Sequence, residues 1–214
     1  MTVTLLIIAG LVAVGDWVAV HQRLFRIEYL LKPLTLALLV AAAATADLGA
    51  IEAWVVAALA FGLLGDVGLM LSRGGRADPP FLAGLGAFLL GHIAYIVAFV
   101  RIDVRLIDLV AGALIALGVS ALALPKVLRG SESSAGRVFA VIVAGYAAVL
   151  AAMTAFAVGT GIVLVAIGGV LFLVSDTIIA WQRFVRPVRH GAVAVIVSYH
   201  LAQFLILIGL VRSA

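Results

Sequence analysis

The chain has 214 residues, of which 66% are hydrophobic and only 11% are charged; its net charge is +4 and its mean hydropathy is +1.32. Soluble domains carry about 25% charged residues, so this composition excludes a soluble globular protein and predicts an integral membrane protein. The chain has no cysteine, which excludes disulfides, a thiol nucleophile and a thiolate metal site.

The apolar runs are long and do not alternate with polar residues, so they predict transmembrane helices and not barrel strands. We expect an all-α polytopic membrane protein in which residues 1–214 form a single transmembrane domain, an eight-helix bundle. The predicted spans are about 2–20, 32–46, 51–72, 80–100, 106–125, 137–157, 161–182 and 191–211. The first run has no basic segment before it and leads into further spans, so we expect a retained helix and not a cleaved signal peptide. The longest connection is expected around residues 130–134.

The basic residues lie between the apolar runs, which indicates membrane topology and not nucleic-acid binding. The connections after the first, third, fifth and seventh spans carry most of them: Arg23, Arg26, Lys32, Arg73, Arg76, Lys126, Arg129, Arg137, Arg183, Arg186 and Arg189. The opposite side carries Arg101, Arg105 and Arg212. Positive charge marks cytoplasmic loops, so we expect both termini outside and a location in the bacterial inner membrane. All five prolines are expected at span ends: Pro33, Pro79, Pro80, Pro125 and Pro187.

Two aspartates lie inside apolar runs. Asp66 is seven residues before Arg73, and Asp176 is seven before Arg183, so each is expected about 10 Å inside the cytoplasmic end of its helix. An acid within the hydrocarbon is costly and faces a protein interior, where it is paired or used. We therefore interpret both as functional, with a structural hydrogen bond as the alternative.

Further polar side chains lie on neighbouring predicted spans. His92 and Tyr95 share one helix face in the fourth span, Tyr199 and Gln203 stack in the eighth, and Lys32 lies near the cytoplasmic rim. Together with the two aspartates they predict a polar cavity open to the cytoplasmic leaflet. Each has a structural alternative: an interhelical hydrogen bond for the histidine, packing for the tyrosines, and an interfacial topology role for the lysine.

A faint internal repeat accompanies these residues. Asp66 precedes His92 by 26 residues and Asp176 precedes His200 by 24, which favours two parallel four-helix halves. The sequence lacks the Glu-x-x-His and His-Glu-x-x-His spacings of helical metal sites and the Gly-x-Ser-x-Gly of serine hydrolases. We expect neither a metal nor another cofactor.

Five segments resemble the YhhN-like lysoplasmalogenase family in their order and in their placement on the spans. These segments are Lys32–Thr35, Gly65–Leu69, Gly84–Tyr95, Ser175–Ala180 and Tyr199–Gln203. The resemblance covers nearly the whole chain and excludes His200 and Asp16, which are not carried over from the family. It implies hydrolysis of the vinyl ether bond of lysoplasmalogens, which are lysophospholipids. The products of this hydrolysis would be a fatty aldehyde and a glycerophospho-ethanolamine or glycerophospho-choline.

The polar residues suit the chemistry that the resemblance implies. A vinyl ether is cleaved by protonation of its alkene carbon, which creates an oxocarbenium ion that water captures. A carboxyl group withdrawn from water can keep its proton near neutral pH, and glycosidases use two carboxyl groups around a similar cation. Our hypothesis is that Asp66 and Asp176 form such a pair, with the donor unassigned. His92 and Tyr95 would orient an acid or water, Lys32 would bind the phosphate, and Tyr199, Gln203 and Ser175 would support the site.

Two other classes of function remain open at this point. Intramembrane Asp and His also build proton relays, so a proton-coupled transporter of a small or lipid-like solute is the alternative. It ranks second because no predicted span is broken by proline and the outer half lacks polar residues. A packing factor without chemistry would explain the 22 glycines but not the converging polar groups.

Overall fold

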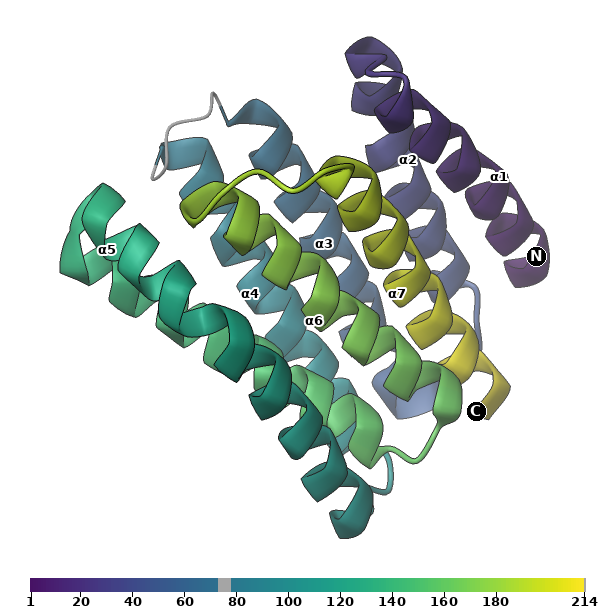
Figure 1. Cartoon of the computed structure of the whole chain (residues 1–214). Helices are drawn as coiled ribbons and strands as arrows, with labels where there is room; N and C mark the ends of the chain where they lie inside the picture. Colours follow the sequence, from purple (N-terminus) through teal and green to yellow (C-terminus); the bar gives the residue numbers. More distant parts are fainter. Residues whose placement is uncertain (73–77, 214) are drawn as a thin grey trace.

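The computed structural model describes residues 1–72 and 78–213, and over these residues it is helical without strands (Figure 1). Within them, seven helices are long and apolar enough to cross a membrane. The prediction of an all-α, polytopic integral membrane protein is confirmed. Arg73 and Arg76, which the charge argument used, lie outside the described residues.

The helices follow the predicted spans closely at most ends. They are α1 Thr2–His21, α2 Phe25–Ala44, the short 3₁₀ helix η1 Gly49–Ile51, α3 Glu52–Leu71, α4 Pro79–Val100, α5 Leu106–Gly159, α6 Val163–Phe184 and α7 Gly191–Ser213. The second helix begins seven residues earlier than expected, because the chain re-enters a helix directly after a turn at Arg23, where φ is positive. Pro33 therefore lies inside α2 and Pro125 inside α5, so the prediction that all prolines mark span ends was wrong.

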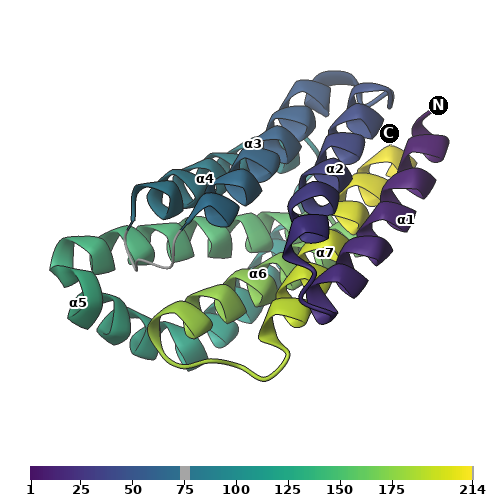
Figure 2. The ribbon, with the colours of Figure 1, turned by 90° about the horizontal axis from the view of Figure 1, so that it is seen from above.

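Helix α5 explains why the described residues contain seven spanning helices where the sequence predicted eight spans. Both predicted spans 106–125 and 137–157 lie in α5, which has 54 residues. A straight helix of that length would extend about 80 Å, far beyond a hydrocarbon core of about 30 Å. Gly136 interrupts it with φ 84° and ψ 172°, a conformation that glycine adopts readily, and the ribbon turns back there (Figure 2). Residues 130–134, expected to be a loop, are helical.

The bundle brings both chain ends to one side. The hydroxyl of Thr2 donates to the carbonyl of Thr45 at 2.8 Å, and Thr2 and Val211 line the same surface pocket. The N- and C-terminal ends accordingly lie near each other in both ribbon views. The loops that join α1 to α2 and α6 to α7 lie at the opposite end (Figure 1).

Close packing between α3 and α4 sets the position of the first intramembrane acid. At Gly68 an added Cβ would lie 2.6 Å from the Cα of Gly84, so only glycine allows the two backbones to approach this closely. Small residues at such crossings are typical of helix association in membranes. Asp66, two residues earlier on α3, is buried in the bundle, and its side chain is 1% exposed.

Candidate functional site

The first acidic centre is an ion pair between α2 and α3. The ammonium of Lys32 lies 3.0 Å from Oδ1 of Asp66, and the two side chains are 12% and 1% exposed. Lys32 was expected near the cytoplasmic rim, but the early start of α2 places it two turns inside the helix. The Lys32 ammonium is therefore the direct neighbour of the Asp66 carboxyl group inside the bundle.

Three of the predicted supporting residues surround this ion pair. The Tyr95 hydroxyl donates to Oε1 of Gln203 at 2.5 Å, which links α4 to α7. The Gln203 amide and the Tyr199 hydroxyl both face Gly62, one turn before Asp66, where an added Cβ would lie 3.1 Å and 3.2 Å from them. Tyr199 also interacts electrostatically with Asp66. The absence of a side chain at Gly62 thus lets α7 bring two polar groups beside the α3 carboxylate.

The second acidic centre joins α4, α5 and α6. The Tyr146 hydroxyl donates to Oδ2 of Asp176 at 2.5 Å, and Nε2 of His92 lies 3.4 Å from the same oxygen and 3.0 Å from the Tyr146 hydroxyl. His92 thus contacts Asp176. Sequence reasoning missed Tyr146; its one signal was a tyrosine in the middle of the predicted span 137–157.

An aromatic layer lies between the two centres. The Phe172 ring makes edge contacts with His92 at a centroid distance of 4.8 Å and with Tyr199 at 5.4 Å. Asp66 and Asp176 are close enough to interact electrostatically, although each has its own hydrogen-bonding partners. The structure therefore places the two acids in neighbouring networks that meet across apolar rings.

Two cavities lie beside these networks. The first, of about 90 Å³, lies between α4, α5 and α6; its wall is almost entirely apolar, with Asp176 and Tyr146 among the polar exceptions. The second, of about 360 Å³, lies between α2, α6 and α7 and includes Lys32. Both include Ile179 and Arg183, so they adjoin. Asp66 is on the wall of neither, which differs from the expected single chamber containing both acids.

Two of the remaining candidates, Ser175 and His200, have hydrogen-bonding partners on other helices. Ser175 donates to the carbonyl of Val195 at 3.2 Å and so ties α6 to α7. Nδ1 of His200 accepts a hydrogen bond from Nε1 of Trp17 at 3.1 Å, whereas His92 contacts Asp176. The two histidines of the internal repeat therefore have different partners. Asp16 is buried within α1. Over residues 1–72 and 78–213, no group of three or more His, Asp or Glu side chains could hold a metal ion.

The chain matches the YhhN family over residues 27–210. It is also 37% identical over 46 residues to human lysoplasmalogenase TMEM86B, a match that covers 22% of this chain and 20% of the human protein. The alignment thus spans only a fifth of the curated relative, and no solved structure matches the chain. Because the family match covers most of the chain, this protein belongs to the YhhN family.

Proposed function

We propose that this protein is a membrane-embedded hydrolase that cleaves the vinyl ether bond of lysoplasmalogens. The observation that carries the proposal is the Asp176 carboxyl group on the wall of an otherwise apolar cavity, with a second, ion-paired acid nearby. An acid facing an apolar space suits a substrate whose reactive bond adjoins a hydrocarbon chain. Family membership and the name of the human relative support the same activity.

The proposed reaction needs one proton donor and one negative group. Asp176 donates its proton to the alkene carbon, and the resulting oxocarbenium ion is stabilised by the negative charge of Asp66. Water adds to the cation and gives a hemiacetal, with its released proton returning to Asp176. The hemiacetal then collapses to the fatty aldehyde, and the glycerol oxygen leaves as a hydroxyl group. No covalent enzyme intermediate and no cofactor are required.

The geometry supports a division of roles between the acids. Asp66 has the Lys32 ammonium at 3.0 Å, whereas Asp176 has the Tyr146 hydroxyl and the His92 ring beside Oδ2 among the described residues. Oδ1 of Asp176 is then available to carry a proton toward the cavity. In this proposal His92 and Tyr146 orient Asp176; Tyr95, Tyr199 and Gln203 hold Asp66 in place, and Ser175 supports the helix that bears Asp176.

The lipid head group is assigned to the second cavity. Lys32 lies on its wall while also pairing with Asp66, so its ammonium can bind a phosphate without leaving the carboxylate uncompensated. The hydrocarbon chain would occupy the apolar cavity beside Asp176. Ile179 and Arg183 line both cavities, so one lysophospholipid would place its head group and its chain on the two sides of these residues.

The membrane arrangement is part of the proposal. Both chain ends lie on one side and α5 turns back at Gly136, which supports an even number of crossings and hence eight spans in one domain over residues 1–214. We propose that these eight spans form two parallel four-helix halves. The basic connections favour both termini outside a bacterial inner membrane, with the site opening to the cytoplasmic leaflet.

Purified protein incubated with a lysoplasmenyl lipid tests the activity. We expect the wild type to release fatty aldehyde, measured by mass spectrometry after trapping. In both Asp66→Asn and Asp176→Asn the rate of aldehyde release should be at least about 100-fold lower. Asp47→Asn, at an exposed aspartate beyond the end of α2, is the matched control and should retain full activity. Retained activity in either test variant would remove that acid from its role, and no aldehyde from the wild type would refute the function.

A further inference from the structure

The second cavity carries charges of both signs. Glu28 and Lys32 line it from α2, while Gln182 and Arg183 line it from α6. Its volume of about 360 Å³ falls within the usual range of small-ligand sites. A cavity that served only to bind phosphate would gain nothing from an acidic wall residue, so Glu28 requires an explanation.

The two positively charged side chains of this cavity, Lys32 and Arg183, each form an ion pair with an aspartate. Lys32 pairs with Asp66 at 3.0 Å, and Arg183 pairs with Asp78 at 3.2 Å while its guanidinium lies 3.8 Å from the centre of the Phe81 ring. These contacts fix both positive groups at the cavity wall. Fixed cations on α2 and α6 can bind an anion between the helices with little loss of side-chain entropy.

Glu28 is different, because Lys32 does not neutralise it. The two residues are four apart on α2, a spacing at which opposite charges commonly pair on a helix. Lys32 instead forms its ion pair with Asp66, and Glu28 has no ion pair with any described residue. Glu28 is only partly buried. The cavity therefore presents a negative group beside two fixed positive groups.

We propose that Glu28 binds the ammonium group of a zwitterionic phospho-amine head group, whose phosphate lies between Lys32 and Arg183. This inference rests on the proposed function, since it places the hydrocarbon chain of the same lipid in the adjoining apolar cavity. Ile179 and Arg183, shared by both cavities, mark where the glycerol passes from one to the other. Glu28 thereby becomes a specificity-determining residue, favouring amine head groups over head groups whose only charge is the phosphate.

Binding of lipids that cannot react tests this assignment separately from catalysis. Saturated alkyl-ether lysolipids of one chain length, with either a phosphoethanolamine or a phosphoglycerol head group, lack the vinyl ether bond. We expect the full-length protein to bind the phosphoethanolamine lipid about fivefold more tightly. Glu28→Gln should reduce the ratio of the two Kd values to about one, and Glu28→Lys should invert it. The ratio is measured on one protein sample, so partial loss of folded protein does not affect it.

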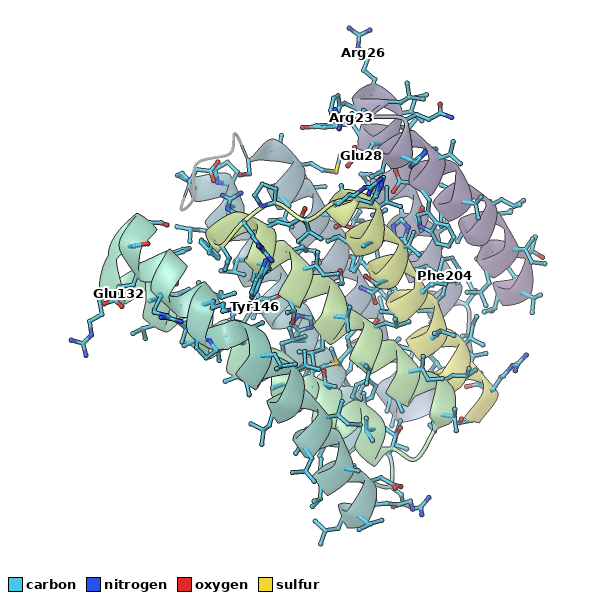
Figure 3. All side chains as sticks on the ribbon, viewed as in Figure 1. Arg23, Arg26, Glu28, Glu132, Tyr146 and Phe204 are labelled. Atoms are coloured by element: carbon cyan, nitrogen blue, oxygen red, sulfur yellow. The ribbon has the colours of Figure 1, made fainter. Side chains whose placement is uncertain are left out.

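Glu132→Gln is the matched control. Glu132 is exposed on α5, on the far side of the bundle from Glu28, which lies near Arg23 and Arg26 (Figure 3). The control should keep the wild-type ratio of Kd values. A wild type without head-group preference, or a Glu28→Gln variant with an unchanged ratio, would overturn the assignment even if aldehyde release is observed. Selective binding without aldehyde release from vinyl ether lipids would leave it intact and refute the proposed function.

Discussion

The two intramembrane aspartates occupy matching positions in the sequence but contrasting surroundings in the fold. Asp66 is 1% exposed, pairs with a lysine ammonium and lies away from both cavities. Asp176 is 10% exposed, lies on the wall of the apolar cavity and has a tyrosine hydroxyl and a histidine ring beside one oxygen. Two aspartates at matching sequence positions thus have different electrostatic partners.

This contrast suggests how two acids can share one reaction. Asp66 has an ammonium group beside it, whereas Asp176 has a hydroxyl group and an imidazole ring beside it and lines an apolar cavity. Environments that separate two acids in this way are the usual basis for assigning a proton donor and a charge stabiliser. On this proposal Asp176 donates and Asp66 stabilises, and the variants below are chosen to break or sharpen that difference.

The largest effect is expected at Asp176. Replacement by Asn keeps an acceptor for Tyr146 but removes the proton, so kcat for aldehyde release should fall by about 10³-fold or more, and further than in Asp66→Asn. Initial rates at saturating lipid give this comparison. Ser120→Ala, at another polar residue of the same cavity wall, should change kcat little. Equal losses in the two aspartate variants would contradict the division of roles.

The ion pair at Asp66 should dominate stability. Lys32→Met leaves a buried carboxylate without its cation, so we expect the free energy of unfolding to fall by about 3 to 5 kcal/mol. The double variant Lys32→Met/Asp66→Asn removes both charges and should recover most of that loss, while remaining inactive. Thermal or denaturant unfolding in one detergent measures all three proteins. If the double variant is no more stable than Lys32→Met, Asp66 is not held by this pair.

A smaller effect is expected from Tyr146, which we treat as a positioning residue for Asp176. Tyr146→Phe keeps the ring and its contact with His92 but deletes the hydroxyl that donates to Oδ2. Loss of one hydrogen bond to a charged or reacting group lowers a rate constant by about 10-fold. We expect kcat to fall by this factor while KM stays nearly unchanged. An increase in KM alone would instead indicate a role in lining the cavity.

The sequence predicted this contrast only in part. Both aspartates stood out because acids interrupt apolar runs, and their depth followed from the distance to Arg73 and Arg183. Their partners could not be derived, since helical periodicity does not reveal which helices are neighbours. Tyr146 lies in a separate predicted span from the acid that it contacts. Lys32 was placed at the rim because Pro33 was taken as a helix start, whereas α2 begins at Phe25 and carries the lysine inward.

The smallest effect is expected at Asp16, a buried acid on α1 that the proposed reaction does not use. Neither of its carboxyl oxygens has a hydrogen-bond partner among the described residues, although it interacts electrostatically with Lys32. Asp16→Asn removes a buried acid without breaking an ion pair, so aldehyde release should stay within about twofold and stability should not decrease. Rates and unfolding temperature together check this; a loss of activity like that of Asp66→Asn would make Asp16 a third member of the site.

Protonation of the alkene carbon is the central step of the proposed reaction, and isotope incorporation tests it most directly. In D₂O the exchangeable proton of the donor carboxyl group is replaced by deuterium. When the wild type cleaves a lysoplasmenyl lipid, it should therefore transfer deuterium to the alkene carbon. Aldehyde trapped at once and analysed by mass spectrometry should therefore carry one deuterium next to the carbonyl, with free aldehyde in D₂O as the exchange control. Enzymatic aldehyde without that deuterium would contradict carbon protonation by a carboxyl group.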